Sequence, residues 1–471
     1  MAADGTEKRI TLKLMVLKEE RKVIFAEAGK DFVDVLFSFL TLPLGTIARL
    51  VRKESKVQPP KVASLNSLYQ SVENLDEACL RTHTCKGMLL RPRNSMEAYC
   101  GSIKINIDDT EPAKYFVCNN LIICGRQNPV LISTFKNKRC RCGTLLEKPI
   151  SFKTSNIFDG FVKANASFMI TDDLKDSGIK NTSSVSEMTV HITKNQVVDI
   201  LKCCLCSRTV LTDLFLEKIS SEILHTSKRI APSYLKANDS GKITVKIIQR
   251  KSSGKIIFAE GKEDFADFLC SLLTIPLGGA VHLMEGYSCV GSVDGLYKSV
   301  VDLDEDYFTT KEVKNKFVDP VLAPQFKMGK LIPFMSDDVP KCYCYVELYL
   351  DGSLIRMCYL TIHEKICNIY PKSCVAGEFV DPLSDTSDGG TTYIKGPTTY
   401  MATDDLVVTP SSSISVMSLL NSMNIPVDDL KEKVIRIGME EGVRILQASL
   451  ISTSALTLGL SHMLTKVKEE K

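Results

Sequence analysis

Residues 22–45 read KVIFAEAGKDFVDVLFSFLTLPLG, and residues 255–278 read KIIFAEGKEDFADFLCSLLTIPLG. The two stretches align without a gap and share 15 of 24 positions, which unrelated segments do not do by chance. The chain therefore contains an internal repeat.

Shorter matches in the same order extend the repeat over most of the chain. They are Leu-Tyr-x-Ser-Val at residues 68–72 and 296–300, and Met-x-Thr-Asp-Asp-Leu at residues 169–174 and 401–406. We expect two copies, residues 6–227 and 239–471, joined by a turn-rich linker at residues 228–238. Copy one is degenerate near residues 176–188, where copy two has the Ser-capped helical pattern of residues 409–426.

Each copy opens with the pattern of a β-hairpin followed by a helix. In copy one, apolar residues alternate over residues 10–17, a polar turn follows, and a returning strand covers residues 23–26. Helical spacing begins near Lys30. Copy one closes with helices near residues 195–206 and 209–220, and copy two closes with a helix over residues 439–464. The spacing predicts further strands at residues 103–107 and 115–118. We expect an α+β fold of two internally duplicated modules with a β-grasp-like opening, packed on each other.

These motifs resemble the plant domain-of-unknown-function family six-seven-four. The resemblance rests on the opening segment LKLMVLKEERKVIFAEAGKDFVDVLFSFLTLPLGTIARLV, on Cys-Lys-x-Met-Leu-Leu at residues 85–90, and on Thr-Asp-Asp-Leu followed by TPSSSIS. It covers nearly the whole chain. It implies a duplicated plant protein without an established activity, and it supplies no catalytic residues.

Composition narrows the class of protein. Hydrophobic residues make up 44% and charged residues 24% of the sequence, as in ordinary globular proteins, and the net charge is only +3. Residues 1–230 carry a net charge of +9 and the remainder −6, which favours attraction between the copies. Uncharged runs, the longest at residues 445–465, contain too many polar residues for a membrane helix. The polar start and an odd number of cysteines indicate free thiols and a cytoplasmic location, with the nucleus as an open alternative.

Four cysteines of copy one form the best candidate site. They are Cys118, Cys124, Cys140 and Cys142, with a glycine after the last. Four thiolates on neighbouring loops are the ligands that a structural zinc ion prefers, so zinc is the one cofactor that the sequence suggests. The spacing differs from the paired Cys-x-x-Cys of zinc ribbons, and buried free thiols that pack as small apolar side chains are the alternative. Copy two offers a weaker set: Cys358, His363, Cys367 and Cys374.

The other candidates favour structural roles. Asp172-Asp173 and Asp404-Asp405 recur between the copies, and they are typical of a polar turn at a strand end, because adjacent strand residues point to opposite faces. The basic loop at residues 135–141 has only one aromatic residue, too few for a nucleic-acid-binding stripe. His83 and Cys85, two residues apart on a predicted loop, say little about geometry. Nucleotide-binding and hydrolase signatures are missing from the sequence.

The sequence therefore favours a non-enzymatic soluble protein that acts by binding other proteins, without a membrane. A zinc-stabilised nucleic-acid-binding module is the first alternative, and an enzyme of unknown type is the second.

Overall fold

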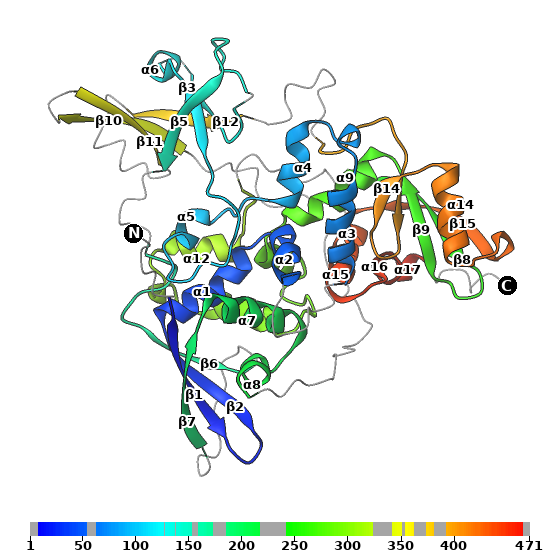
Figure 1. Cartoon of the computed structure of the whole chain (residues 1–471), viewed down its shortest axis with the longest axis horizontal. Coiled ribbons are helices and arrows are strands. Elements are labelled where there is room, and N and C mark those ends of the chain that lie inside the picture. Colours follow the sequence, from blue (N-terminus) through cyan, green and yellow to red (C-terminus); the bar gives the residue numbers. More distant parts are fainter. Residues whose placement is uncertain are drawn as a thin grey trace, which may run out of the picture.

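The computed structural model describes most of the chain. The described residues are 8–53, 63–126, 128–136, 138–152, 159–172, 185–216, 242–323, 342–350, 354–361, 374–380 and 392–464. The predicted linker at residues 228–238 lies outside them, as does most of the degenerate stretch near residues 176–188. The described residues form an α+β structure with three sheets, which confirms the predicted α+β class (Figure 1).

The first sheet contains four antiparallel strands in the order β6-β2-β1-β7. Its strands are β1 (Ile10–Leu17), β2 (Lys22–Gly29), β6 (Ser167–Thr171) and β7 (Val185–Ile192). Alternate side chains of β1, beginning with Ile10, Leu12 and Leu14, are buried, so one face of this sheet covers the core. Helix α1 (Lys30–Thr41) follows β2 directly, as predicted.

The second sheet has the order β14-β13-β9-β8-β15. Its strands are β8 (Ile243–Arg250), β9 (Ile256–Gly261), β13 (Tyr400–Thr403), β14 (Val408–Pro410) and β15 (Leu430–Ile437). Helix α9 (Glu263–Ser271) follows β9, and helix α14 (Ser413–Ser422) packs on the side of the sheet that faces away from the main core.

The third sheet is a closed six-stranded barrel, which lies at the margin of the molecule in Figure 1 with only the short α6 beside it. Three of its strands come from the first half of the chain: β3 (Tyr115–Cys118), β4 (Val130–Ser133) and β5 (Leu146–Phe152). The other three come from the second half: β10 (Cys342–Leu350), β11 (Leu354–Thr361) and β12 (Cys374–Phe379). The parallel pairs β11–β5 and β12–β4 join the two groups.

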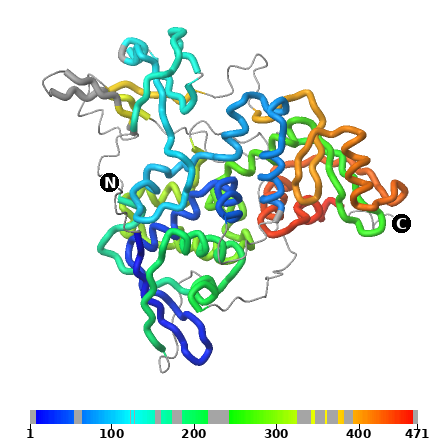
Figure 2. The backbone as a smooth tube through the Cα atoms, viewed as in Figure 1, coloured from blue at the N-terminus to red at the C-terminus, as the bar shows by residue number. Residues whose placement is uncertain are grey.

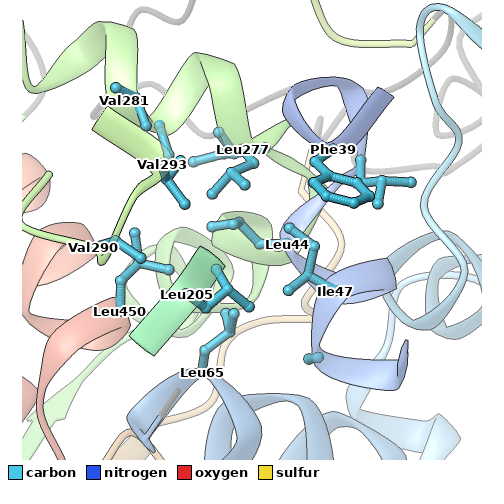
Figure 3. Close-up of a cluster of buried hydrophobic side chains, with 14 of the residues drawn as sticks. Phe39, Leu44, Ile47, Leu65, Leu205, Leu277, Val281, Val290, Val293 and Leu450 are labelled. Carbon is cyan, nitrogen blue, oxygen red and sulfur yellow. The ribbon is translucent and has the colours of Figure 1, made fainter. Parts of the chain in front are cut away.

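Helices from both halves share one hydrophobic core. The remaining helical elements are α2 (Leu44–Val51), α3 (Ala63–Asn74), η1 (Glu77–Cys79), α4 (His83–Leu90), α5 (Glu97–Cys100), α6 (Leu121–Cys124), α7 (Lys194–Cys206), α8 (Val210–Phe215), η2 (Leu272–Thr274), α10 (Leu277–Leu283), α11 (Val293–Asp302), η3 (Glu305–Tyr307), α12 (Lys311–Val318), η4 (Val427–Asp429), α15 (Met439–Ile451), α16 (Ala455–Gly459) and α17 (Ser461–Leu464). Leu44 and Ile47 lie among Leu277, Val293 and Leu450 (Figure 3). The tube in Figure 2 shows the blue first helices against the green and red segments of the second half.

Backbone contacts join the halves where the polypeptide enters α2 and α10. The amide of Leu44 donates to the carbonyl of Ile275 at 2.8 Å, and the amide of Leu277 donates to the carbonyl of Leu42 at 2.9 Å. Pro43 and Pro276 form an isolated bridge between these bonds. The bonds fix the register of the two loops, so the shared core is held by backbone as well as by apolar packing.

Two predicted elements are wrong. Residues 103–107 form no strand, although Ile103, Ile105 and Ile107 are buried, because the segment extends over the core without joining a sheet among the described strands. The expected long helix at residues 439–464 is three helices, because the backbone at Ser452 is extended and its carbonyl accepts the Ser64 hydroxyl at 2.6 Å. Within the described ranges, no helix is long and apolar enough to cross a membrane.

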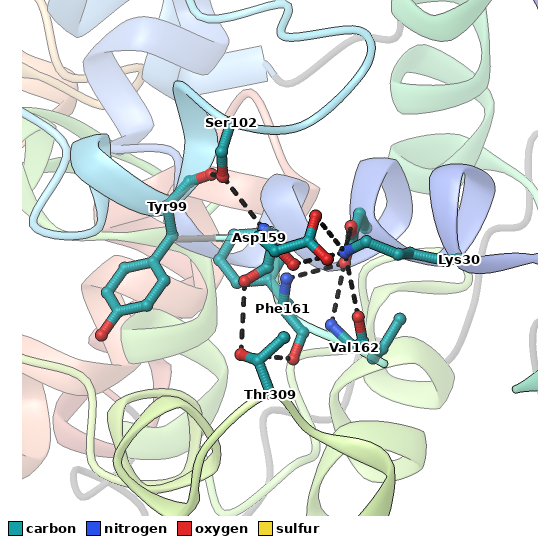
Figure 4. A network of polar contacts seen from close by, with 9 residues as sticks. Lys30, Tyr99, Ser102, Asp159, Phe161, Val162 and Thr309 are labelled. Carbon is teal, nitrogen blue, oxygen red and sulfur yellow. Dashed lines mark hydrogen bonds and ion pairs between the residues drawn. The ribbon is translucent and has the colours of Figure 1, made fainter. Parts of the chain in front are cut away.

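On α1 and on α9, a buried aspartate accepts hydrogen bonds from the backbone of a distant loop. Asp34 of α1 accepts the amides of Phe161 and Val162 at 2.8 and 3.0 Å, and Lys30 pairs with it at 2.7 Å (Figure 4). Asp267 of α9 accepts the amides of Tyr393 and Ile394 at 2.6 and 3.2 Å. The position that Lys30 holds in the first repeat is Glu263 in the second, so Asp267 lacks that ion pair.

Candidate metal centre

Four cysteine thiols meet at one edge of the barrel. Cys118 ends β3, Cys124 ends α6, and Cys140 and Cys142 lie in the turn before β5. Their four sulfur atoms all lie within 4.8 Å of one another. The Sγ of Cys118 is 3.5 Å from that of Cys142 and 4.0 Å from that of Cys124. The structure therefore brings together the four residues that the sequence singled out.

The turn that carries Cys140 and Cys142 is a tight hairpin. Arg139 and Leu145 form an antiparallel bridge, and the Cys140 amide donates to the Thr144 carbonyl at 2.8 Å. The Gly143 amide donates to the Cys140 carbonyl at 2.8 Å, and Gly143 adopts a left-handed conformation with φ +85°. A residue without Cβ adopts that conformation readily, which explains the glycine after the last cysteine.

The spacing of the sulfur atoms fits a tetrahedral zinc ion. A Zn–S distance of about 2.3 Å places the sulfurs of a tetrahedral site about 3.8 Å apart. The two distances to Cys118 lie on either side of that value, and both are far longer than a disulfide bond of about 2.0 Å. The Asn120 amide also donates to the Cys118 sulfur at 3.3 Å, which stabilises a thiolate there.

Burial differs among the four thiols. Cys118 and Cys140 pack with Phe116 and Leu146 in a small apolar cluster, whereas Cys142 is exposed. Burial raises the pKa of Cys118, and burial likewise raises the pKa of Cys124 to about 12. Hydrogen bonds from the side chain and backbone of Thr144 lower the pKa of Cys142 to about 6. The cluster thus has two buried thiols, one half-buried thiol (Cys124) and one thiol exposed to water (Cys142).

Basic residues are frequent in the sequence around Cys140 and Cys142. Residues 126–148 contain six Lys or Arg and one Glu, a net charge of +5. Arg139 donates to the Gly143 carbonyl at 2.9 Å, and Arg141 donates to the Pro129 carbonyl at 2.7 Å, so both brace the turn. Zinc with four thiolates carries a net charge of −2, which these side chains would offset. Arg139, Arg141 and Thr144 were not predicted as part of the site, although their places beside the Cys-x-Cys-Gly turn are the signal that identifies them.

The weaker cysteine set of copy two is not assembled in the same way. Cys374 is disulfide-bonded, so it is not a free thiol there. The side chain of Cys358, together with His363 and Cys367, lies outside the described residues. Fourteen of the described cysteines are not disulfide-bonded, as expected, and Cys374 departs from that expectation.

Three of the recurring aspartates accept hydrogen bonds from residues in helices. Asp172 accepts the amide and the hydroxyl of Thr212 at the start of α8, at 2.9 and 2.6 Å. Asp404 accepts the amide of Thr457 in α16 at 2.7 Å. Asp405 accepts the Ser67 hydroxyl at 3.0 Å, and Asp173 lies outside the described residues. Asp172, Asp404 and Asp405 each contact a different helix, so these three described aspartates do not share one acid–base site.

The pair His83 and Cys85 belongs to the first turn of α4. The Cys85 thiol is fully buried and lies 3.1 Å from the Thr82 hydroxyl, whereas His83 is exposed. Burial raises the pKa of Cys85, which keeps it a thiol rather than a nucleophilic thiolate.

The barrel edge and its four thiols define the chain as an α+β protein with a candidate structural metal centre. The family comparison is more specific. The family model described as "Protein of unknown function (DUF674)" matches residues 6–441, and the chain belongs to this family. No curated protein and no solved structure matches the chain.

Proposed function

We propose that the chain is a non-enzymatic binding protein whose barrel is stabilised by one structural zinc ion on Cys118, Cys124, Cys140 and Cys142. The observation that carries the proposal is the approach of all four sulfur atoms to within 4.8 Å of one another. Four protein ligands fill a tetrahedral zinc site and leave no open position for substrate, which favours a structural role over a catalytic one.

Bound zinc would supply cross-links between segments that otherwise meet only through short strands. Cys118 and Cys124 flank the end of β3, and Cys140 and Cys142 belong to the hairpin before β5. Joining them would stabilise the folded barrel, because the unfolded chain holds no preformed site. A stabilised barrel at the margin of the helical body suits a protein that presents surfaces to partners.

We further propose that the two halves are copies of one module. The support is a set of equivalent contacts: the Tyr69 hydroxyl donates to the Leu90 carbonyl at 3.1 Å, and the Tyr297 hydroxyl donates to the Val318 carbonyl at 3.5 Å. The buried Asp34 and Asp267 capture equivalent loops in the same way. Each half also contributes three strands to the barrel, with its first strand in the middle. We place this duplicated protein in the plant cytoplasm, with the nucleus open, on the family resemblance and the free thiols.

Metal analysis tests the zinc proposal. The full chain, purified without chelators, is expected to contain about one equivalent of zinc by elemental analysis. Cys118→Ser removes a buried ligand and is expected to lower the content to a small fraction. Cys206→Ser is the matched control, since Cys206 is an exposed thiol on α7, remote in sequence from the cluster. Zinc far below one equivalent in the unaltered chain would contradict the proposal.

Nucleic-acid binding is the second candidate function. It rests on the exposed Arg126, Lys136, Arg139 and Arg141 near the thiols. Arg141 already pairs with Glu378 at 2.6 Å, and the same charges offset a zinc–thiolate cluster, so protein binding is the better supported reading. A titration with single- and double-stranded nucleic acid over a range of salt decides between them. Tight binding that weakens steeply with salt would favour nucleic acid.

A further inference from the structure

The side of the first sheet that faces away from the core carries an apolar patch. We call it the outer face of the first sheet and define it by Lys13, Met15, Ile24, Phe25, Glu27 and Met169. Strand register places these side chains together, since Met15 pairs with Phe25 and Met169 pairs with Glu27. Met169 is 51% exposed, and Met15, Ile24 and Phe25 are only half-buried.

The second sheet repeats this face position by position. Its residues are Lys246, Ile248, Ile257, Phe258, Glu260 and Met401. The register is the same, because Ile248 pairs with Phe258 and Met401 pairs with Glu260. Five of the six side chains are identical between the faces, and Met15 is replaced only by the similarly apolar Ile248.

Helix α14 covers the face of the second sheet. Leu420 of α14 and Ile425 just after it are buried against Ile248, Ile257, Phe258 and Met401, with Val416 and Leu419 beside them. Met401 is only 4% exposed there. The Ser411 hydroxyl, just before α14, donates to the Glu260 carboxylate at 2.6 Å. The same surface is therefore seen in this chain with a helix seated on it.

We propose that the outer face of the first sheet binds an amphipathic helix of a partner protein with the chemistry of α14. The required helix carries an apolar stripe at the spacing of Val416, Leu419 and Leu420, and a hydroxyl before its first turn that reaches Glu27. Lys13 and Glu187 form an ion pair at 3.6 Å on this sheet, so the apolar patch is flanked by charges of both signs. Mixed charge around an apolar centre suits a protein helix better than a polyanion. This inference is independent of the zinc site.

A peptide of residues 409–426 provides the probe. A hydrocarbon staple between positions 414 and 418, which are exposed on α14, holds it helical without touching the apolar stripe. Calorimetric titration into the full-length chain is expected to show saturable binding at one site per chain. Met169→Lys places a charge on the patch and is expected to weaken binding at least about tenfold. Val434→Lys, at a side chain 62% exposed on the second sheet, is the matched control and is expected to bind as the unaltered chain does.

Two outcomes overturn the proposal. One is the absence of saturable binding. The other is binding that Met169→Lys leaves unchanged, which would place the peptide elsewhere, including on the second sheet in exchange with α14. A peptide carrying Leu420→Asp must also lose binding, because Leu420 is the most buried side chain of the helix. Thermal melts of each variant check that the fold is retained, and the half-exposed position of Met169 makes that the expected result.

Discussion

Replacing Asp267 with asparagine is expected to stabilise the protein at alkaline pH. The Asp267 carboxyl is buried in α9 and accepts two backbone amides through one oxygen. Asparagine keeps an oxygen acceptor at that point and removes the buried charge. The variant therefore separates the cost of the charge from the value of the two hydrogen bonds.

The magnitude follows from the pKa. Burial raises the pKa of Asp267 from 3.8 to about 7, although the amides of Ile394 and Tyr393 and the charge of Arg81 act in the opposite direction. Between these two values the folded chain holds a proton that the unfolded chain has lost, so the free energy of unfolding falls as the pH rises. At about 1.36 kcal/mol per pKa unit, the total loss by pH 8 is roughly 4 kcal/mol.

Urea denaturation of both proteins at intervals from pH 5 to pH 8 measures this effect. The difference in unfolding free energy between Asp267→Asn and the unaltered chain is expected to rise by roughly 3 kcal/mol over that range in favour of the variant. A constant offset from the buried amide group leaves this slope unchanged. A difference that stays flat with pH would refute the reasoning, since it would mean that Asp267 does not titrate between the two states.

Asp34 provides the matched comparison. It makes the equivalent pair of amide contacts, but Lys30 pairs with it at 2.7 Å. Asp34→Asn removes the nearer carboxylate partner of a largely buried ammonium group, which keeps Asp159 at 3.6 Å, and is expected to destabilise the chain by about 1–3 kcal/mol at pH 7. Opposite signs for the two variants at pH 8 would show that the Lys30 ion pair decides the outcome.

Three further changes test other parts of the structure. Gly160→Ala is expected to cost several times more stability in urea denaturation than Gly143→Ala. Both glycines have positive φ, but only a Cβ at residue 160 would clash with the Asp34 carboxylate. Equal losses for the two variants would contradict this. Thr212→Val is expected to lower the unfolding free energy by about 1–3 kcal/mol, since its hydroxyl accepts the Val23 amide at 2.8 Å and donates to Asp172; an unchanged denaturation midpoint would count against it. When the two halves, residues 1–230 and 239–471, are expressed separately, neither is expected to show a cooperative melt, because each lacks three barrel strands and part of the shared core. Two halves that melt independently at the midpoints of the full-length chain would reject this.

Local patterns predicted the elements whose partners are close in sequence. The alternation over residues 10–17 and the helical spacing after Lys30 appear in the structure as β1 and α1. Residues 103–107 show the same alternation without forming a strand, because periodicity reports which side chains are buried and not whether a neighbouring strand supplies hydrogen bonds. The strand at residues 115–118 was predicted correctly, but the barrel was not, since its parallel pairings join residues about two hundred positions apart.

The four cysteines were identified from their residue type and the glycine after Cys142, but the sequence did not predict the distances between their sulfur atoms. Cys118 and Cys142 are 24 positions apart, and their 3.5 Å approach depends on the α6 turn and on the hairpin closed by Gly143. The Ser452 break in the last helical segment was missed for a related reason. The Ser64 hydroxyl, almost four hundred positions earlier, donates to the Ser452 carbonyl, and helical periodicity alone cannot predict such a long-range contact.

The shared barrel sets an order of events during synthesis. Strands β3, β4 and β5 leave the ribosome well before β12, whose last residue is Phe379. At about 5–20 residues per second, the roughly 230 intervening residues take about 10–50 s. During that interval β4 and β5 are unpaired edges on an incomplete sheet, which is the kind of surface that pairs with other nascent chains. A zinc ion bound by Cys118, Cys124, Cys140 and Cys142 would stabilise this half-barrel before the second half is made, so metal supply during translation would affect the yield of folded protein as well as the stability of the finished molecule.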